Sequence, residues 1–337
     1  MKKVLVSFIL VTIICITPAY ACTSFAVYSE QPLYAMNFDY SPTEIRFCVV
    51  EDREKDLSVF SMTFKYGYRY ASTVVMNNKG QFGCSQMQYP AETGKSARSE
   101  DEIFSHEILG LQMKESYLEE VLLQLEKKRF VHWENVTAHV LLADVSGNAA
   151  IIEAGADENE IVAITDDFIV MTNFKNSDFR GQSYDRVAGT GSDRYIKAYD
   201  HIVANKDNFS IDAALEGLEK TAQRSTLCSM VFAPKENNIY FALNQDFSKL
   251  WKLSIDDKTI ETFRGFGESA KFPIPEEGVL AADLLKSNAE EDEGADEGAD
   301  EDASGLREVL FYGALVLAAI AVIFISIVYM KRKSRAA

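Results

Sequence analysis

A short apolar segment at the start of the chain ends directly before a cysteine, and this arrangement constrains the rest of the molecule most. Two lysines precede the apolar run 4–16, and residues 19–21 read Ala-Tyr-Ala, the small-x-small pattern of a signal-peptidase site. We therefore expect residues 1–21 to be a signal peptide and Cys22 to become the first residue of an exported chain. The run is short for a span, so an N-terminal membrane anchor is a weaker alternative. A lipoprotein is another, and the bulky Tyr20 argues against it.

The other end of the chain carries a longer apolar segment. Val309–Met330 is 22 residues without a charge, and at ~1.5 Å rise per residue it can cross a ~30 Å hydrocarbon core. The basic tail 331–337 follows, and positive charge marks the cytoplasmic side of a span. We expect a single-pass protein of the cell membrane with an extracytoplasmic body. One alternative is a cell-wall sorting tail, but no LPxTG-like motif precedes the segment. Another is a buried core helix, which fits poorly with the acidic stretch before the segment and the basic cluster after it.

An acidic linker is expected between body and membrane, at 287–308. Residues 290–302 hold nine of the 51 acidic side chains and no basic one, within a tandem Glu-Gly-Ala-Asp repeat. Such a segment repels itself and is predicted to be extended and disordered, with a calcium-binding strip as the alternative. The net charge of −17 also argues against a nucleic-acid partner, because phosphate neutralisation needs clustered Lys and Arg.

The body, residues 22–286, is predicted to be one α+β domain. Apolar spacing predicts helices over 102–128, 192–204 and 211–222. Strands are predicted before and after them, at 23–29, 33–40, 47–51, 59–66, 71–76, 81–86, 138–143, 149–153, 161–165, 168–172, 229–233, 239–243, 251–254 and 259–263. Strands, then helices, then strands favour antiparallel sheets layered against helices. A homo-oligomeric assembly of the body is compatible with the sequence.

An N-terminal cysteine carries its own base. Once residues 1–21 are removed, the α-amino group of Cys22 has a pKa near 7.7–8.0 and lies within reach of its own thiol. Such a pair can attack an amide carbonyl without a histidine, so the four histidines need no catalytic role. The alternative is an ordinary cysteine, paired in the oxidising exterior to Cys48, Cys84 or Cys228. The five cysteines form neither a CxxC pair nor a Cys/His cluster, so we expect no metal and no cofactor.

Several motifs in order then resemble a known family. The opening at 22–27 reads Cys-Thr-Ser-Phe-Ala-Val, and 33–40 reads Leu-Tyr-Ala-Met-Asn-Phe-Asp-Tyr. They are followed by Met-Asn-Asn-Lys-Gly at 76–80, Gln-Met-Gln-Tyr-Pro at 86–90, Val-Met-Thr-Asn at 170–173, Ser-Asp-Arg-Tyr at 192–195, and the approach to a late strand at 225–231. This series resembles the choloylglycine hydrolase and penicillin V acylase family, N-terminal-nucleophile hydrolases of linear amides related to the isopenicillin-N acyltransferase group.

The resemblance implies a four-layer αββα fold and assigns roles by position. Cys22 would be the nucleophile and, through its amine, the base, and Asp39 would orient that amine. Asn173 would donate its side-chain amide to the oxyanion. Arg194 would supply the positive charge that favours the thiolate. Three of these residues also have an ordinary alternative. Asp39 would then be a turn residue, Asn173 a strand-end cap and Arg194 a surface helix residue.

Two positions depart from the family pattern. Met36 stands where the family has an arginine beside the nucleophile, which replaces a fixed charge with an apolar wall. Gln88 replaces an asparagine at a position that contributes to the oxyanion or substrate site. Both departures argue against a specific prediction of bile-salt hydrolysis.

The function predicted from these residues is hydrolysis of a small N-acyl amide with an apolar acyl group. The pocket would be lined by Phe25, Met36, Phe38, Met87 and Tyr89. Two alternatives stay open: an acyltransferase of the same fold, and a surface binding module whose catalysis has decayed.

Overall fold

A computed structural model of the chain describes residues 22–115 and 117–292. The predicted signal peptide, membrane span and basic tail lie outside the described residues. The chain divides into two compact units, residues 1–287 and 288–337, and the described residues belong to the first except for Asn288–Asp292 at the end of helix α6.

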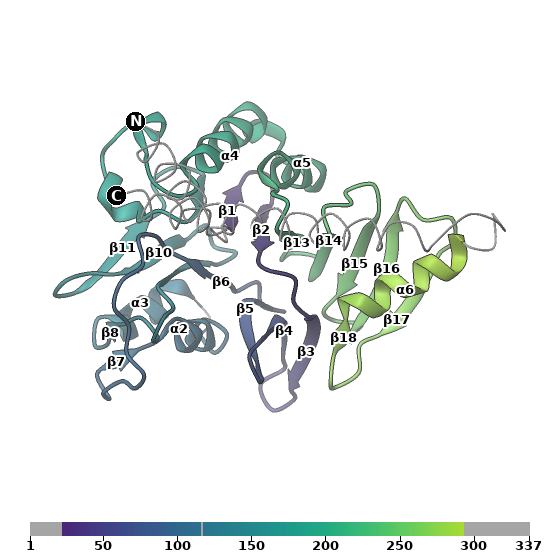
Figure 1. The fold of residues 1–337 in the computed structure, drawn as a ribbon, viewed down its shortest axis with the longest axis horizontal. Coiled ribbons are helices and arrows are strands. Elements are labelled where there is room, and N and C mark those ends of the chain that lie inside the picture. The colour runs from purple at the N-terminus through teal and green to yellow at the C-terminus, as the bar shows by residue number, and fades with distance from the viewer. Residues whose placement is uncertain (1–21, 116, 293–337) are drawn as a thin grey trace, which may run out of the picture. The chain divides into compact units, whose positions relative to one another are not determined.

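Two eight-stranded antiparallel sheets form the centre of the body (Figure 1). We call them sheet A and sheet B. Sheet A has the order β12-β1-β2-β13-β14-β15-β16-β17. Its strands are β1 (Thr23–Tyr28), β2 (Pro32–Asp39), β12 (Phe168–Met171), β13 (Thr226–Ala233), β14 (Asn238–Leu243), β15 (Leu250–Ser254), β16 (Thr259–Arg264) and β17 (Lys271–Pro273).

Sheet B has the order β11-β10-β9-β6-β5-β4-β3-β18. Its strands are β3 (Ile45–Asp52), β4 (Leu57–Tyr66), β5 (Arg69–Asn77), β6 (Phe82–Met87), β9 (Ala138–Ala143), β10 (Ala149–Ala154), β11 (Asn159–Ala163) and β18 (Val279–Leu280). A short parallel pair joins β7 (Glu102–Ile103) to β8 (Arg129–Phe130). The longer strands match the predicted ones within a few residues.

The helices lie outside the sheets. The α-helices are α2 (Ser105–Gln112), α3 (Leu118–Leu125), α4 (Ser192–Asn205), α5 (Ile211–Thr221) and α6 (Ala281–Asp292). The 3-10 helices are η1 (Asn176–Phe179), η2 (Tyr184–Arg186) and η3 (Lys206–Asn208). Helix α5 begins at Ile211, as predicted, and its N-cap is Ser210, whose hydroxyl accepts a hydrogen bond from the backbone N–H of Ala213.

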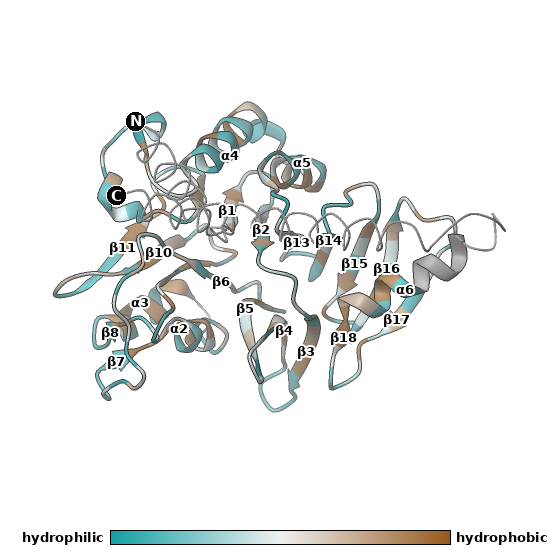
Figure 2. Ribbon diagram, in the orientation of Figure 1, coloured by the Kyte–Doolittle hydropathy of each residue, from teal (hydrophilic) through white to brown (hydrophobic). Residues whose placement is uncertain are grey.

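Strand alternation produces three apolar cores and therefore four layers. One face of β1 packs under α4 and α5, where Phe25 belongs to the same apolar cluster as Ile202 and Leu218. The outer face of sheet B packs in the same way against α2 and α3. The largest core lies between the sheets, where Tyr34 of sheet A stacks on Phe82 of sheet B with ring centroids 4.9 Å apart. The apolar colouring follows these central strands (Figure 2), and the expected mixed fold with two large antiparallel sheets is confirmed.

Two predicted elements differ from the structure. The single helix expected over 102–128 is two helices, because the chain turns between them and the Asp144 carboxylate accepts the backbone N–H of Leu118 at the start of α3, 3.0 Å away. The linker predicted from residue 287 begins as a helix instead, since α6 continues through Asp292.

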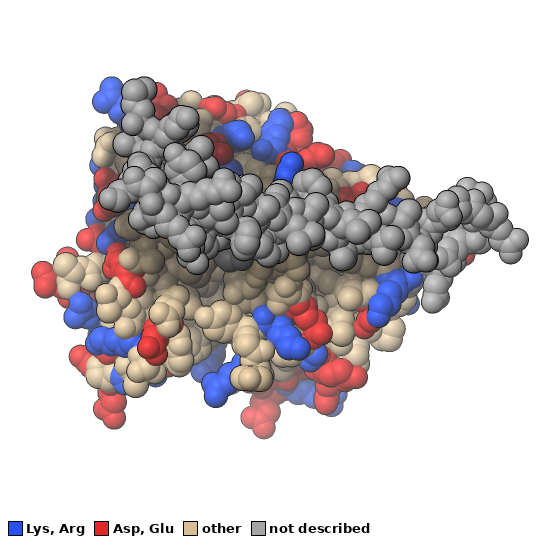
Figure 3. Space-filling model, viewed as in Figure 1, with Lys and Arg blue, Asp and Glu red and all other residues tan. Residues whose placement is uncertain are grey.

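No helix among residues 22–115 and 117–292 is both long and apolar enough to cross a bilayer. Acidic and basic side chains are interspersed over the described part of the visible face (Figure 3).

Candidate active site

Cys22 lies immediately before β1, with its side chain in the core between the two sheets. Only 5% of the residue is exposed, and the backbone N–H of Asp39 donates to its Sγ at 3.5 Å. Burial raises the pKa of the Cys22 thiol, and the nearby Asp39 carboxylate raises it further. The thiol therefore needs a base and a compensating positive charge before it can act as a nucleophile.

Asp39 ends β2 beside Cys22, and a β-bulge fixes its partners. The register between β2 and β13 shifts between Thr226 and Cys228, which places Thr226 opposite Asp39. Thr226 donates its hydroxyl to one carboxylate oxygen, and Gln223 donates its amide to the other at 2.9 Å. Burial raises the pKa of Asp39 to about 6, although these hydrogen bonds and the charge of Arg194 act against the shift.

Arg194 connects the parts of the site. It lies in the first turn of α4, is 3% exposed, and donates to the backbone carbonyl oxygen of Cys22. It also donates to the Thr23 hydroxyl at 2.6 Å and to the Asn173 side-chain oxygen at 2.8 Å. Burial lowers the pKa of Arg194, but a guanidinium starts high enough to stay charged.

A glycine leaves room for this guanidinium. Gly191, the N-cap of α4, has a φ of 85°, which non-glycine residues rarely adopt. A Cβ there would lie 2.4 Å from an Arg194 guanidinium nitrogen and 3.1 Å from the Thr172 hydroxyl. The Gly-Ser-Asp-Arg order at 191–194 therefore serves both the turn into α4 and the approach of the arginine.

Asn173 follows β12 and is fully buried. Its oxygen is held by Arg194, and its amide nitrogen donates to the backbone carbonyl of Met87 at 2.5 Å. The amide nitrogen carries a second N–H. Two partners fix the plane of the Asn173 amide, and neither of them uses that second N–H.

Gln88 and Met36 occupy the interior near this group. The backbone N–H of Gln88 is bonded to the Thr137 carbonyl at 2.9 Å, so that N–H is already used within the protein. Met36 is fully buried and pairs with Ser24 of β1. Since Ser24 is two residues after Cys22, Met36 lies diagonally across from the nucleophile on the same face of sheet A.

The expectation that Phe25 lines the same pocket as Met36 and Phe38 is wrong. Phe25 lies three residues after Cys22, so strand alternation turns its side chain to the opposite face. It packs under the helices against Phe209, with ring centroids 6.1 Å apart. Met36 and Phe38 do face the core between the sheets.

The cysteines in the described residues are free thiols: Cys22, Cys48, Cys84 and Cys228. Cys22 is therefore not in a disulfide with any of the other three. No group of three metal-binding side chains occurs within residues 22–115 and 117–292.

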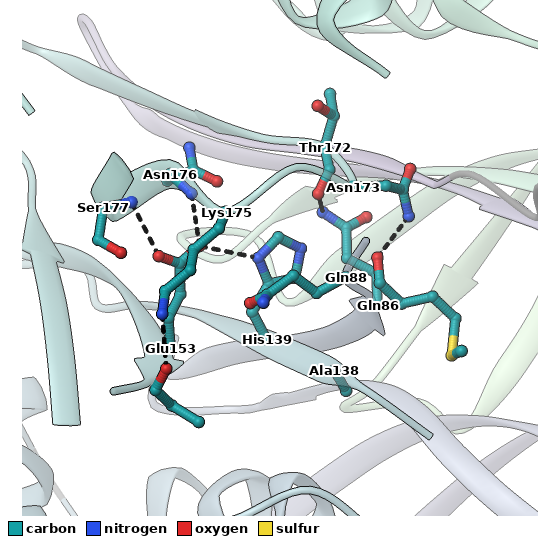
Figure 4. A network of polar contacts seen from close by, with 12 residues as sticks. Gln86, Gln88, Ala138, His139, Glu153, Thr172, Asn173, Lys175, Asn176 and Ser177 are labelled. Carbon is teal, nitrogen blue, oxygen red and sulfur yellow. Dashed lines mark hydrogen bonds and ion pairs between the residues drawn. The ribbon is translucent and has the colours of Figure 1, made fainter. Parts of the chain in front are cut away.

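A second polar group lies on sheet B, and the sequence did not identify it (Figure 4). Glu153 accepts hydrogen bonds from the backbone N–H groups of Asn176 and Ser177 at 2.7 and 2.8 Å, and its carboxylate pairs with His139 Nδ1 at 3.1 Å. Gln86 donates to the Thr172 carbonyl at 3.2 Å, next to Asn173. His139 and Glu153 are 14 residues apart on neighbouring strands, so no short motif contains both.

A pocket of about 510 Å³ lies between β11, β12 and α4. Phe174 and Tyr195, the residues that follow Asn173 and Arg194, line it together with Phe168, Tyr184 and Tyr199. Its lining includes none of the predicted site residues.

Comparison with known proteins identifies the fold. No protein-family profile matches the chain, and no curated protein matches it in sequence. The conjugated bile acid hydrolase from Clostridium perfringens matches in structure: one single-residue mutant has a TM-score of 0.53 and 13% identity over 76% of this chain and 97% of that one. A second variant of that hydrolase gives 0.51 and 14%, over 77% and 98%. The chain has the fold of this hydrolase.

Penicillin V acylase from Agrobacterium tumefaciens is similar in the same way, with a TM-score of 0.50 and 16% identity over 72% of this chain and 90% of the acylase. The resemblance seen in the sequence motifs is thus confirmed at the level of the fold. That resemblance singled out Cys22, Asp39, Asn173 and Arg194, and hydrogen bonds link the four residues around Cys22.

Proposed function

We propose that the chain, once residues 1–21 are removed, hydrolyses linear non-peptide amides with Cys22 as the nucleophile. The observation that carries the proposal is the contact set of Arg194, which joins the Cys22 carbonyl to the Asn173 side chain. One cation thereby fixes the residue that bears the nucleophile and the residue that bears the oxyanion donor.

The reaction follows from these positions. The freed α-amino group of Cys22 takes the thiol proton, and the sulfur attacks the amide carbonyl carbon. The negative charge that develops on the carbonyl oxygen is stabilised by the second N–H of Asn173. The C–N bond breaks, the leaving nitrogen receives the proton from the α-amino group, and a thioester remains. Water then attacks the thioester and releases the carboxylic acid and the thiol.

Asp39 supports the base rather than the nucleophile. Its carboxylate is held by Thr226 and Gln223, close enough to Cys22 to affect the thiol. A carboxylate there orients the amine and stabilises its ammonium form during the reaction. In the full-length chain the Cys22 nitrogen belongs to a peptide bond and cannot act as this base.

The substrate proposed is a small N-acyl amide with an apolar acyl group. Met36 and Phe38 face the space between the sheets near Cys22, and neither brings a charge. An unpaired carboxylate buried beside Met36 would cost several kcal/mol. We infer a preference for substrates without a carboxylate next to the scissile bond.

We also propose that residues 309–330 anchor the enzyme in the cell membrane with its catalytic domain outside. Full-length protein should then sediment with membranes, and a chain truncated after Asp292, which keeps α6, should be released in soluble and active form. A truncated chain that stays with the membranes would contradict the anchor.

The function is tested on the purified mature protein. It should start at Cys22, react rapidly with iodoacetamide at that thiol, and hydrolyse members of an N-acyl amide panel. Cys22→Ser should abolish turnover while keeping the circular dichroism spectrum. Activity only when an amine acceptor is added would favour the acyltransferase, and a blocked Cys22 with no turnover would favour the binding module.

A further inference from the structure

A row of buried polar side chains crosses sheet B at the level of the active site. In the pairing of β6 with β9, Gln86 lies directly opposite His139, so the two side chains share one face of the sheet. Glu153 of β10 continues the row on the other side of His139. Gln88 follows Gln86 by two residues, and its backbone continues the ladder to Thr137. Figure 4 shows His139 between Glu153 and the two glutamines.

The row faces Cys22 across the space between the sheets. Phe82 of β6 stacks on Tyr34, which pairs with Ala26 of β1. Two residues further along β6, Cys84 contacts the hydroxyl of Ser24, with Sγ and Oγ 3.4 Å apart. Beyond the contact of Cys84 with Ser24, Gln86 is the next inward-facing position on β6 and Cys22 is the next one at the start of β1. Both therefore lie on the same side of that contact.

The partners of each donor fix which atoms point into this space. The Thr172 carbonyl can only accept, so it holds the Gln86 amide nitrogen and leaves Gln86 Oε1 on the other side. The Glu92 carboxylate does the same to Gln88, at 3.5 Å. The Glu153 carboxylate holds a proton on His139 Nδ1, so the tautomer that this contact selects has Nε2 as its acceptor.

These three acceptors are left open. Gln86 Oε1, Gln88 Oε1 and His139 Nε2 have no hydrogen-bond partner among the described residues, although their side chains are 96–100% buried. A buried acceptor without a donor is costly, and a cluster of them next to a nucleophile calls for a donor that arrives from outside the chain.

We propose that Gln86, Gln88 and His139 form an acceptor wall that binds a hydrogen-bond-donating group of the substrate, a hydroxyl or an ammonium. The proposal rests on the amide hydrolase function above and adds the chemistry of the substrate beside the scissile bond. Glu153 acts as a positioning residue, because it fixes the His139 tautomer.

The negative charge of Glu153 in this row disfavours ligands that carry a carboxylate. Burial alone would raise the pKa of Glu153, but the hydrogen bonds from His139, Ser177 and Asn176 hold it below its usual value. Glu153 is therefore a carboxylate at neutral pH. A substrate carboxylate would meet three acceptor atoms with this negative charge behind them, so it is disfavoured here as it is beside Met36.

The test uses three substrates with one decanoyl chain, the amides of 3-aminopropanol, butylamine and β-alanine. They differ at one end of the amine, where a hydroxyl, a methyl or a carboxylate stands. For the mature enzyme, kcat/KM should be highest for the alcohol, by about fivefold to tenfold over the butyl amide, the worth of one net hydrogen bond. The β-alanine amide should be the poorest substrate.

Two variants and a matched control locate the effect. Gln86→Leu and Gln88→Leu should each move the alcohol-to-butyl ratio toward one. Gln112→Leu should leave the ratio unchanged. Gln112 is an equally buried glutamine whose Oε1 also has no partner among the described residues, but it lies on α2, which packs on the outer face of sheet B, away from Cys22. The proposal is contradicted if the alcohol-to-butyl ratio of kcat/KM is near one in the native enzyme, or if both wall variants keep the native ratio. Buried water would then be the partner of these acceptors.

Failure of the hydrolase function gives a different result. If the mature protein hydrolyses none of the three amides, the proposed function fails. Calorimetric binding to Cys22→Ala protein then decides the wall by itself. Tighter binding of the alcohol than of the butyl amide, lost in Gln86→Leu, supports the wall. Equal binding, or no binding of either, contradicts it.

Discussion

Arg194 donates a hydrogen bond to the backbone carbonyl oxygen of Cys22, across a sequence separation of 172 residues. The contact holds the residue by its carbonyl, so the thiol and the nitrogen are both left for chemistry. Since the same guanidinium binds Thr23 and Asn173, the start of β1 and the end of β12 are fixed to α4 together.

Removal of residues 1–21 should switch the enzyme on. The Cys22 nitrogen becomes an amine with a pKa near 7.7–8.0 only after the peptide bond before it is cut. Mass spectrometry of active protein should therefore show Cys22 as the first residue, and a variant blocked at the cleavage site by Ala21→Pro should be inactive. Turnover by an uncleaved chain would remove the amine from the mechanism.

Replacement of Arg194 by lysine should impair activity although the charge is kept. The guanidinium contacts three oxygens at once, on Cys22, Thr23 and Asn173. The compact ammonium of lysine lacks the planar array of N–H donors that reaches all three. We expect kcat to fall on the order of a hundredfold, as for loss of one oxyanion contact. Arg180→Lys, at a half-exposed arginine bonded to the Ile161 carbonyl, is the control and should be near native.

Truncation of Asn173 should affect kcat more than KM. Asn173→Ala removes a donor that is proposed to act on the oxyanion, for which losses of roughly 10²–10³ in kcat are typical. Asn159→Ala is the control, because Asn159 starts β11 at the edge of sheet B and bridges two backbone carbonyls, those of Leu125 and Lys128. Equal kinetic losses in the two variants, measured at matched folded fractions, would make Asn173 a structural residue.

Asp39 should make stability and activity depend on pH in opposite directions. Its folded pKa of about 6 exceeds the ~3.9 of an unfolded aspartate, so the folded state holds more protons between these values. The free energy of unfolding should therefore fall by roughly 2–3 kcal/mol as pH rises from 4 to 6. Over the same window kcat/KM should rise, because the carboxylate that orients the amine forms.

Urea titrations at several pH values check this assignment. The slope should be present in the native protein and in Asp212→Asn, an exposed carboxylate paired with Arg264, and absent from Asp39→Asn. Parallel stability curves for the native protein and Asp39→Asn would assign the titration to another group.

Met36→Arg should shift preference toward anionic substrates. Met36 is buried diagonally across from Cys22, and an arginine there would place a cation beside the scissile bond. The measurement is the ratio of kcat/KM for a neutral and a carboxylate-bearing amide in both proteins. A ratio that does not change in a folded variant would show that position 36 does not face the substrate.

The sequence predicted the elements of the body well where apolar alternation was strong, and the ordered motifs predicted which residues would meet. It failed where a tertiary contact decides the local structure. The break between α2 and α3 depends on the Asp144 carboxylate at the start of α3, which comes from the turn after β9, so apolar spacing alone reads through it.

Two other differences could have been found by following strand geometry. Phe25 is an odd number of residues from Cys22, which places the two side chains on opposite faces of a strand. The hairpin from β9 to β10 pairs Ala143 with Ala149, and the same register carried outward aligns His139 with Glu153. However, the burial of His139 and Glu153 and the unpartnered Nε2 of His139 depend on sheet A and on η1. Both of these are distant in the sequence, so no local pattern predicts them.

The bulge that places Thr226 opposite Asp39 makes the length of β13 as important as its composition. Exchanging an apolar residue of this strand for a similar one alters packing locally. Deleting or inserting one residue near Leu227 would shift every later side chain to the other face and withdraw the hydroxyl from Asp39. Natural variants of this protein should therefore accumulate substitutions in β13 but keep its residue count, with gaps confined to the loops on either side.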